Sequence, residues 1–157
     1  MLVKKTITEI EIREATDKDL SSILSLYSQP DMDNGQVLSI AQSQKLFDRI
    51  KSYPDYKIYA AETRGKIVGT FTLLIMDNIA HMGAPSGIIE DVAVEPECQG
   101  KGIGRRMMEF AMDLCRKKGC YKLALSSNLK RKDAHSFYES LGFKKHGHSF
   151  IVEFTNK

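Results

Sequence analysis

A glycine-rich turn between an apolar strand and a long amphipathic helix constrains this chain more than any other feature. The strand is predicted over residues 87–94 and ends before Pro96, and the turn follows at residues 99–104, which read QGKGIG. A helix is predicted over residues 103–118 because apolar residues recur there at helical spacing. The apolar face comprises Ile103, Met107, Phe110, Ala111, Leu114 and Cys115.

The turn has the composition of an anion-binding site. Glycines let the backbone turn tightly and approach a bound group closely, and the first N–H groups of a helix are unpaired at its positive end. The expected pyrophosphate cradle comprises Gln99, Gly100, Lys101, Gly102, Ile103 and Gly104, with Arg105 and Arg106 adding positive charge. A dinucleotide fingerprint fails because the sixth position from Gly100 is Arg105, and no P-loop occurs. Taken alone, the pattern also fits a turn that binds nothing.

The remaining pattern predicts an α/β fold in the order strand, two helices, three strands, helix, strand, helix and two strands. Thr16 with Asp19 resembles a capping box at the first helix, and Pro30 follows its end. Alternating or apolar runs predict strands over residues 10–15, 56–62, 66–76, 87–94, 121–125, 143–146 and 149–154, and helical spacing predicts helices over residues 16–29, 39–51, 103–118 and 133–140.

Length and composition predict one domain over residues 1–157. A net charge of +3 is too small to indicate nucleic-acid binding. Three cysteines without a CxxC pair indicate reduced thiols, and the four histidines form no convincing metal set, so no metal is expected. We find neither a signal-peptide core nor an apolar run long enough to span a membrane, so we expect a cytoplasmic protein without a membrane partner.

Two motifs resemble the GNAT superfamily of N-acetyltransferases. QGKGIG after an apolar strand is similar to that family's Q/R-x-x-G-x-G/A motif. Residues 128–143 are similar to its N-x-x-x-x-x-A-x-x-F-Y-E-x-x-G-F segment. The resemblance implies a mixed, mostly antiparallel twisted sheet of six to seven strands flanked by about four helices. It also implies acetyl-CoA as the co-substrate.

Cofactor contacts follow from the same resemblance. It implies that the backbone of Val92, Ala93 and Val94 pairs with the pantetheine arm, while residues 99–104 hold the pyrophosphate. Asn128 is expected to contact the pantetheine, and Lys130 or Arg131 the phosphoadenosine. A solvated charged loop is the alternative interpretation of these two cations.

Acetyl transfer to an amine needs a proton acceptor, a donor to the thioester oxygen and a donor to the leaving sulfur. The resemblance implies that the Tyr138 hydroxyl donates to the leaving sulfur; the alternative interpretation of Tyr138 is plain packing. The expected donor to the thioester oxygen is the backbone N–H of Val92 or a nearby residue. Glu90 and Asp91 are the candidate bases, because carboxylates inside an apolar strand are costly. Adjacent strand residues face opposite ways, so one is expected to face the substrate, and Glu90 is favoured. A bulge would change their faces, and pairing with basic groups is the alternative.

The sequence indicates less about the acetyl acceptor than about acetyl-CoA. Segments of the chain resemble glucosamine-6-phosphate and aminoalkylphosphonate N-acetyltransferases, which suggests a small, anionic primary amine attacked directly in a ternary complex. The pocket is expected from residues 27–44 and 77–87. A protein or peptide acetyltransferase and a non-catalytic acyl-CoA sensor are the alternatives. The resemblance also suggests a homodimer through residues 143–154.

Overall fold

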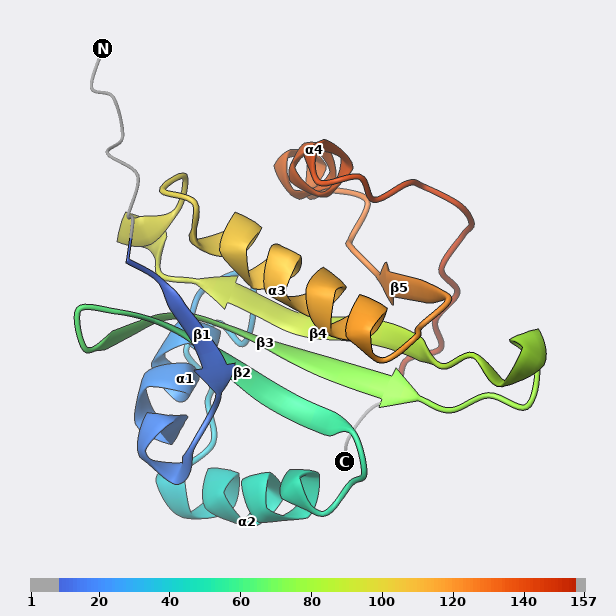
Figure 1. Ribbon diagram of the computed structural model, residues 1–157. Coiled ribbons are helices and arrows are strands. Elements are labelled where there is room, and N and C mark those ends of the chain that lie inside the picture. Colours follow the sequence, from blue (N-terminus) through green and yellow to red (C-terminus); the bar gives the residue numbers. More distant parts are fainter. Residues whose placement is uncertain (1–8, 155–157) are drawn as a thin grey trace. The chain divides into compact units, whose positions relative to one another are not determined.

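The computed structural model describes residues 9–154, which fall into two compact units: one ends at Leu125 and the other begins at Ser126 (Figure 1). The first unit contains a sheet with helices on both faces. The second contains one helix and the segment that follows it. Each unit is described by itself below.

The first unit is built on a mixed, mostly antiparallel sheet. Its strands lie in chain order across the sheet, and only the last pair is parallel. This arrangement confirms the predicted fold class, with five strands in the described residues where six to seven were expected. The strands are β1 (Glu11–Glu14), β2 (Tyr56–Thr63), β3 (Lys66–Met76), β4 (Ser86–Val94) and β5 (Lys122–Leu125).

Three helices cover this sheet, two on one face and one on the other (Figure 1). On the first face, α1 (Leu20–Tyr27) packs Leu26 against Ala60 and Ala93, and α2 (Ile40–Lys51) begins after Ser39, whose side chain caps it. The opposite face carries α3 (Ile103–Lys117). The short helices η1 (Asp17–Asp19), η2 (His81–Gly83) and η3 (Pro96–Cys98) join these elements.

Helix α3 lies directly against the sheet backbone at two glycines. A Cβ atom on Gly69 would lie 2.7 Å from Met107 Sδ, and one on Gly87 would lie 2.7 Å from Cys115 Sγ. Side chains at these positions would push the helix away, because such contacts are far below van der Waals distance. The two glycines therefore let α3 lie close to β3 and β4, which positions its N-terminal turn beyond the end of β4.

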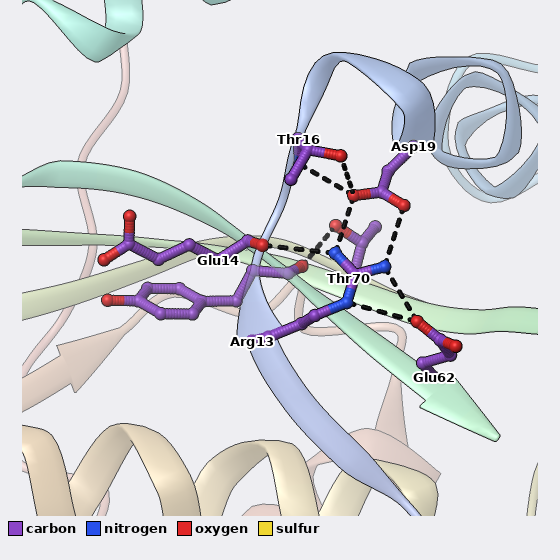
Figure 2. Close-up of polar contacts among 7 residues, drawn as sticks. Arg13, Glu14, Thr16, Asp19, Glu62 and Thr70 are labelled. Atoms are coloured by element: carbon purple, nitrogen blue, oxygen red, sulfur yellow. Dashed lines mark hydrogen bonds and ion pairs between the residues drawn. The ribbon is translucent and has the colours of Figure 1, made fainter. Parts of the chain in front are cut away.

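An ion cluster joins β1, β2 and the start of α1 (Figure 2). The Arg13 guanidinium donates to both carboxylate oxygens of Asp19 at 2.8 and 3.0 Å, and to Glu62 at 2.8 Å. Asp19 Oδ2 also accepts the Thr16 backbone N–H at 2.7 Å, which confirms the predicted capping box. We call Arg13, Asp19 and Glu62 the arginine cluster. It fixes the chain direction between β1 and α1.

The second unit contains α4 (Lys132–Ser140), one residue longer than the helix predicted over residues 133–140. The strands predicted over residues 143–146 and 149–154 are wrong: these residues have no regular secondary structure. Residues 149–154 are rich in apolar side chains that favour strand formation, but a strand also needs a paired neighbour for its backbone groups. Within residues 9–154, no strand pairs with this segment.

Candidate active site

Strand β4 carries a bulge at the two predicted acids. Thr72 of β3 pairs with Glu90, and Thr70 pairs with Ala93, so two residues of β4 lie opposite one of β3. The extra residue is absorbed at Asp91, whose φ is 51°. A positive φ is uncommon for a residue with a side chain, so this local conformation has an energetic cost.

The bulge brings both carboxylates to one face of the sheet. Glu90 lies on the face of its partner Thr72, whose hydroxyl donates to the Glu90 carbonyl at 3.0 Å. The Asp91 carboxylate also interacts with the Thr72 side chain. The prediction that only one of the two acids faces the substrate assumed that side chains alternate regularly along the strand. That alternation does not hold at the bulge. The alternative of a strand bulge describes β4 instead.

The pKa values of both acids are raised from their ordinary values. Loss of hydration beside the packed strands raises the Glu90 pKa, and the negative charge of Asp91 raises it further. The Asp91 pKa is raised by the same loss of hydration and by Asp33, against a hydrogen bond with Thr72 that lowers it. A carboxylate with a raised pKa is a stronger base, which suits proton removal from an ammonium group.

Beyond Ile89, the edge of β4 that faces β5 lacks a strand partner within the described residues. The pairing with β5 ends where Ile89 meets Leu125. Backbone groups alternate in direction along a strand. The Glu95 backbone N–H donates to the Val68 carbonyl, so the backbone groups of Glu95 and, two residues earlier, Ala93 point toward β3. The backbone groups of Val92 and Val94 therefore point toward the unpaired edge. Of the three predicted backbone contacts, the geometry favours Val92 and Val94.

The Val94 carbonyl is held by two side-chain amides. Gln29, beyond the end of α1, and Gln99, in the glycine-rich turn, each donate to it at 3.2 Å. These bonds tie the end of β4 to both flanking segments. The Gln99 side chain thus has a structural partner in addition to its predicted place in the cradle.

The glycine-rich turn leads into α3 in the conformation expected of an anion-binding turn. Gly100 and Gly102 have φ values of 70° and 94°, and Gly102 caps α3 without a side chain. The first N–H groups of the helix therefore carry no side-chain cap. Arg105 and Arg106 both lie near Glu109, at 3.9 and 3.7 Å. The other predicted members lie in the same segment: Gln99, Lys101, Ile103 and Gly104.

In the second unit, Tyr138 lies on α4 among aromatic rings. Its ring centroid is 5.2 Å from that of Phe137 and 5.7 Å from that of Phe143. Burial raises the pKa of its phenol, while the nearby charge of Arg131 lowers it. The phenol therefore stays protonated at neutral pH and can donate a hydrogen bond.

Asn128 forms the turn that precedes α4. Its side-chain oxygen accepts the Lys130 backbone N–H at 2.9 Å, and its carbonyl accepts the Arg131 backbone N–H at 3.0 Å. His135 Nε2 lies 2.9 Å from the same carbonyl. From the sequence, His135 was assigned no role. Its separation of seven residues from Asn128 was the signal that could have revealed this contact.

Other features of the described residues do not add to this site. Two surface hollows in the first unit lie over β1 and the outer side of α3, and of the predicted site residues only Arg106 lines either of them. In residues 9–154, no group of three or more histidine, cysteine or acidic side chains is placed to hold a metal. Among the described helices, none combines the length and apolar character needed to span a membrane.

An unpaired edge on a central strand, followed by a glycine-rich helix N-terminus, defines the class of acyl-CoA N-acyltransferase folds. The chain belongs to the acetyltransferase (GNAT) family, whose family model matches residues 20–143. This match confirms the resemblance of the two motifs and spans segments of both units. The protein is therefore an N-acetyltransferase.

Individual relatives agree with the family match. A glucosamine 6-phosphate N-acetyltransferase of Trypanosoma brucei brucei is 34% identical over 89% of this chain and 92% of its own. An aminoalkylphosphonate N-acetyltransferase of Salmonella typhimurium is 29% identical over 86% of this chain and 85% of its own. The structure of a putative acetyltransferase from Agrobacterium tumefaciens has a TM-score of 0.86 at 29% identity, covering 92% of this chain and 99% of that one.

Proposed function

We propose that this enzyme transfers the acetyl group of acetyl-CoA to a primary amine of a small molecule. The observation that carries the proposal is the β4 bulge, which places the Glu90 and Asp91 carboxylates next to an unpaired strand edge. That edge continues toward the glycine-rich N-terminus of α3. A base and an anion-binding turn thus lie on one continuous segment of the first unit.

The residues present fit acetyl-CoA. The pyrophosphate would lie on the uncapped N–H groups of α3 and near Lys101, because the positive φ values of Gly100 and Gly102 turn the backbone into a cradle. Val92 and the backbone N–H of Val94 would pair with the pantetheine amides, since the Val94 carbonyl already accepts from Gln29 and Gln99. In the second unit, the contacts carried over from the family motif are Asn128 to the pantetheine and Arg131 to the phosphoadenosine.

Acetyl-CoA supplies an acetyl group on a thioester, which an uncharged amine attacks directly. Glu90 accepts the proton of the acceptor ammonium, and its raised pKa suits that task. The Val92 backbone N–H donates to the thioester oxygen as charge builds there. The protonated phenol of Tyr138 donates to the sulfur that leaves. The ammonium nitrogen loses two protons on becoming an amide. Glu90 passes the first to solvent, and the second, lost as the C–S bond breaks, replaces the proton that Tyr138 gives to the leaving thiolate.

A small-molecule acceptor is favoured by the relatives, which are named for glucosamine 6-phosphate and aminoalkylphosphonate. We further propose a homodimer through the segment after α4, because its apolar side chains are exposed. Phe150 is 91% exposed and Phe154 is 81% exposed, which would favour association with a second copy.

The test combines calorimetric titration of acetyl-CoA with a thiol-release assay over a panel of small amines. The wild type is expected to bind acetyl-CoA and to release thiol with one amine class. Tyr138→Phe should retain the affinity for acetyl-CoA and lose thiol release about 10- to 100-fold, because the sulfur loses its donor. Tyr121→Phe, an exposed tyrosine outside the proposed site, is the matched control. Absence of acetyl-CoA binding by the wild type would refute the proposal.

A further inference from the structure

The end of α1 is held against the end of β4. Leu26 belongs to one buried cluster with Ala93, and Tyr27 packs against that cluster. Shortly after the helix, the Gln29 side chain donates from Nε2 to the Val94 carbonyl at 3.2 Å. This bond is partly buried and joins residues that lie far apart in the chain. The helix end and the strand end are therefore joined both by packing and by a hydrogen bond.

The main chain of Gln29 organises the loop that follows it. Its carbonyl accepts the backbone N–H groups of Met32 and Asn34 at 3.0 and 3.1 Å. The chain then turns through two residues with positive φ, Asn34 at 48° and Gly35 at 81°. We call residues 30–35 the α1 loop. Gln29 thus binds β4 through its side chain and the α1 loop through its carbonyl.

The Val94 carbonyl lies on the strand edge that is proposed to receive acetyl-CoA. Gln29 and Gln99 both donate to it, and a carbonyl oxygen has two lone pairs. The group that Val94 has left on this edge is its N–H. A pantetheine arm is therefore expected to pair with that N–H, directly beside the carbonyl that Gln29 holds.

Satisfying the Val94 carbonyl does not by itself account for Gln29. Gln99 already donates to that carbonyl, and one partner is sufficient for a backbone group. Ordering a second glutamine side chain costs conformational entropy. What the Gln29 bond adds is a connection between the strand edge and the α1 loop. That loop lies within residues 27–44, from which the sequence predicts part of the acceptor pocket.

We propose that Gln29 is a positioning residue that couples the α1 loop to the strand edge that binds acetyl-CoA. Binding of the pantetheine arm to the Val94 N–H restrains the strand end, and Gln29 transmits that restraint to the loop. The amine then meets an ordered loop. The inference rests on the proposed function and assigns a role in it to a residue outside both sequence motifs. Gln29 acts through Val94 and the loop, so it is not a catalytic residue.

The kinetic test uses Gln29→Met, which keeps a side chain of similar volume and loses the donor. The dissociation constant of acetyl-CoA, measured by calorimetry, should change by less than about twofold, because Gln99 still holds the Val94 carbonyl. In the thiol-release assay, KM for the amine that reacts fastest in the panel should rise about 3- to 10-fold, the effect of one hydrogen bond. The value of kcat should change less than this KM.

Two further variants show whether the donor is responsible. Gln29→Glu has the same shape, but its carboxylate accepts and does not donate at neutral pH, so it should be at least as impaired as Gln29→Met. Ser52→Ala removes another bond from a side chain to a carbonyl, between Ser52 Oγ and Arg49 at the end of α2. Its kinetics should equal those of the wild type. Wild-type kinetics in Gln29→Glu or Gln29→Met would overturn the inference.

Hydrogen exchange tests the coupling without any acceptor. In the wild type, acetyl-CoA should slow exchange of the Met32 and Asn34 backbone N–H groups about fivefold, the lower end of ordinary coupling between sites. In Gln29→Met, acetyl-CoA should still bind but should no longer slow these groups. A merely structural role for Gln29 would speed their exchange and leave the response to acetyl-CoA intact. Equal slowing in both proteins therefore overturns the inference.

Failure of the inference can be distinguished from failure of the proposed function. A wild type that binds acetyl-CoA and releases thiol, with Gln29→Met indistinguishable from it, overturns the inference alone. A wild type that does not bind acetyl-CoA refutes the proposed function and the inference with it.

Discussion

The arginine cluster and the two acids of the β4 bulge, Glu90 and Asp91, contain the same kind of side chain in opposite electrostatic surroundings. In the arginine cluster, one guanidinium bonds two carboxylates, and Arg13 holds the Asp19 pKa down at about 2 (Figure 2). At the bulge, no cation among the described residues forms an ion pair with Glu90 or Asp91, and the pKa values of both acids are raised. The carboxylates of the arginine cluster are neutralised within the fold, whereas the two acids of the bulge are exposed and have no counterion among the described residues.

The backbone shows the same difference between the two regions. Asp19 lies at the start of a helix, where its carboxylate accepts the Thr16 backbone N–H and completes a regular capping box. Asp91 lies at a bulge with φ of 51°, a conformation with an energetic cost. Strain and unpaired charge coincide at β4, as is common at functional sites. The comparison therefore separates side chains that stabilise the fold from those that are available to a substrate.

The largest expected effect is on catalysis, from Glu90→Gln. Loss of the base should lower kcat about 100- to 1000-fold with the preferred amine, because positioned bases contribute about that much. The melting temperature should not fall, since no described ion pair depends on Glu90. Thiol release and thermal melting check both parts. The matched control is Glu97→Gln, an exposed acid in η3, which should retain full activity. A Glu90→Gln enzyme with normal kcat would transfer the role of base to Asp91.

The next effect is on stability, from Arg13→Met. Removing the cation leaves the carboxylates of Asp19 and Glu62 unpaired, which should lower the free energy of unfolding by about 3 kcal/mol. Activity per folded molecule should be unchanged, because the arginine cluster lies outside the proposed site. Urea unfolding and thiol release below the transition measure the two quantities. Loss of kcat in the folded variant would mean that the arginine cluster also supports the active site.

Features that depend on residues close together in the chain could be predicted from the sequence, and features that depend on strand pairing could not. Thr16 and Asp19 are three residues apart, and the glycine-rich turn adjoins its helix, so short-range patterns predicted both. The faces of Glu90 and Asp91 depend on a bulge that the pairing of β3 with β4 determines, and no local pattern reveals it. The final strands were predicted as a hairpin around Gly147, but the two segments do not pair with each other or with another strand in the described residues.

A smaller effect concerns acid unfolding. The folded pKa of Asp19 is about 2 against an ordinary 3.8, so its contribution is present above about pH 4 and is lost as the pH falls toward 2. That contribution is about 2 kcal/mol. The raised pKa values of Glu90 and Asp91 act in the opposite sense, since protonation relieves their repulsion as the pH falls. Urea unfolding between pH 2 and pH 5 should show a shallower pH dependence for Asp19→Asn than for the wild type; an identical slope would contradict the assignment.

The smallest effect tests whether a paired charge matters when it lies on the surface. Lys57 pairs with Glu14 in the same region as the arginine cluster, but their side chains are 39% and 58% exposed. Water and salt screen such pairs, so Lys57→Ala should change the free energy of unfolding by less than about 0.5 kcal/mol. Urea unfolding at low and high salt measures the difference. A loss comparable to that of Arg13→Met would mean that pairing alone, regardless of burial, stabilises this part of the sheet. A negligible loss would sharpen the distinction, because the importance of the arginine cluster would then lie in its half-buried, multiply bonded geometry.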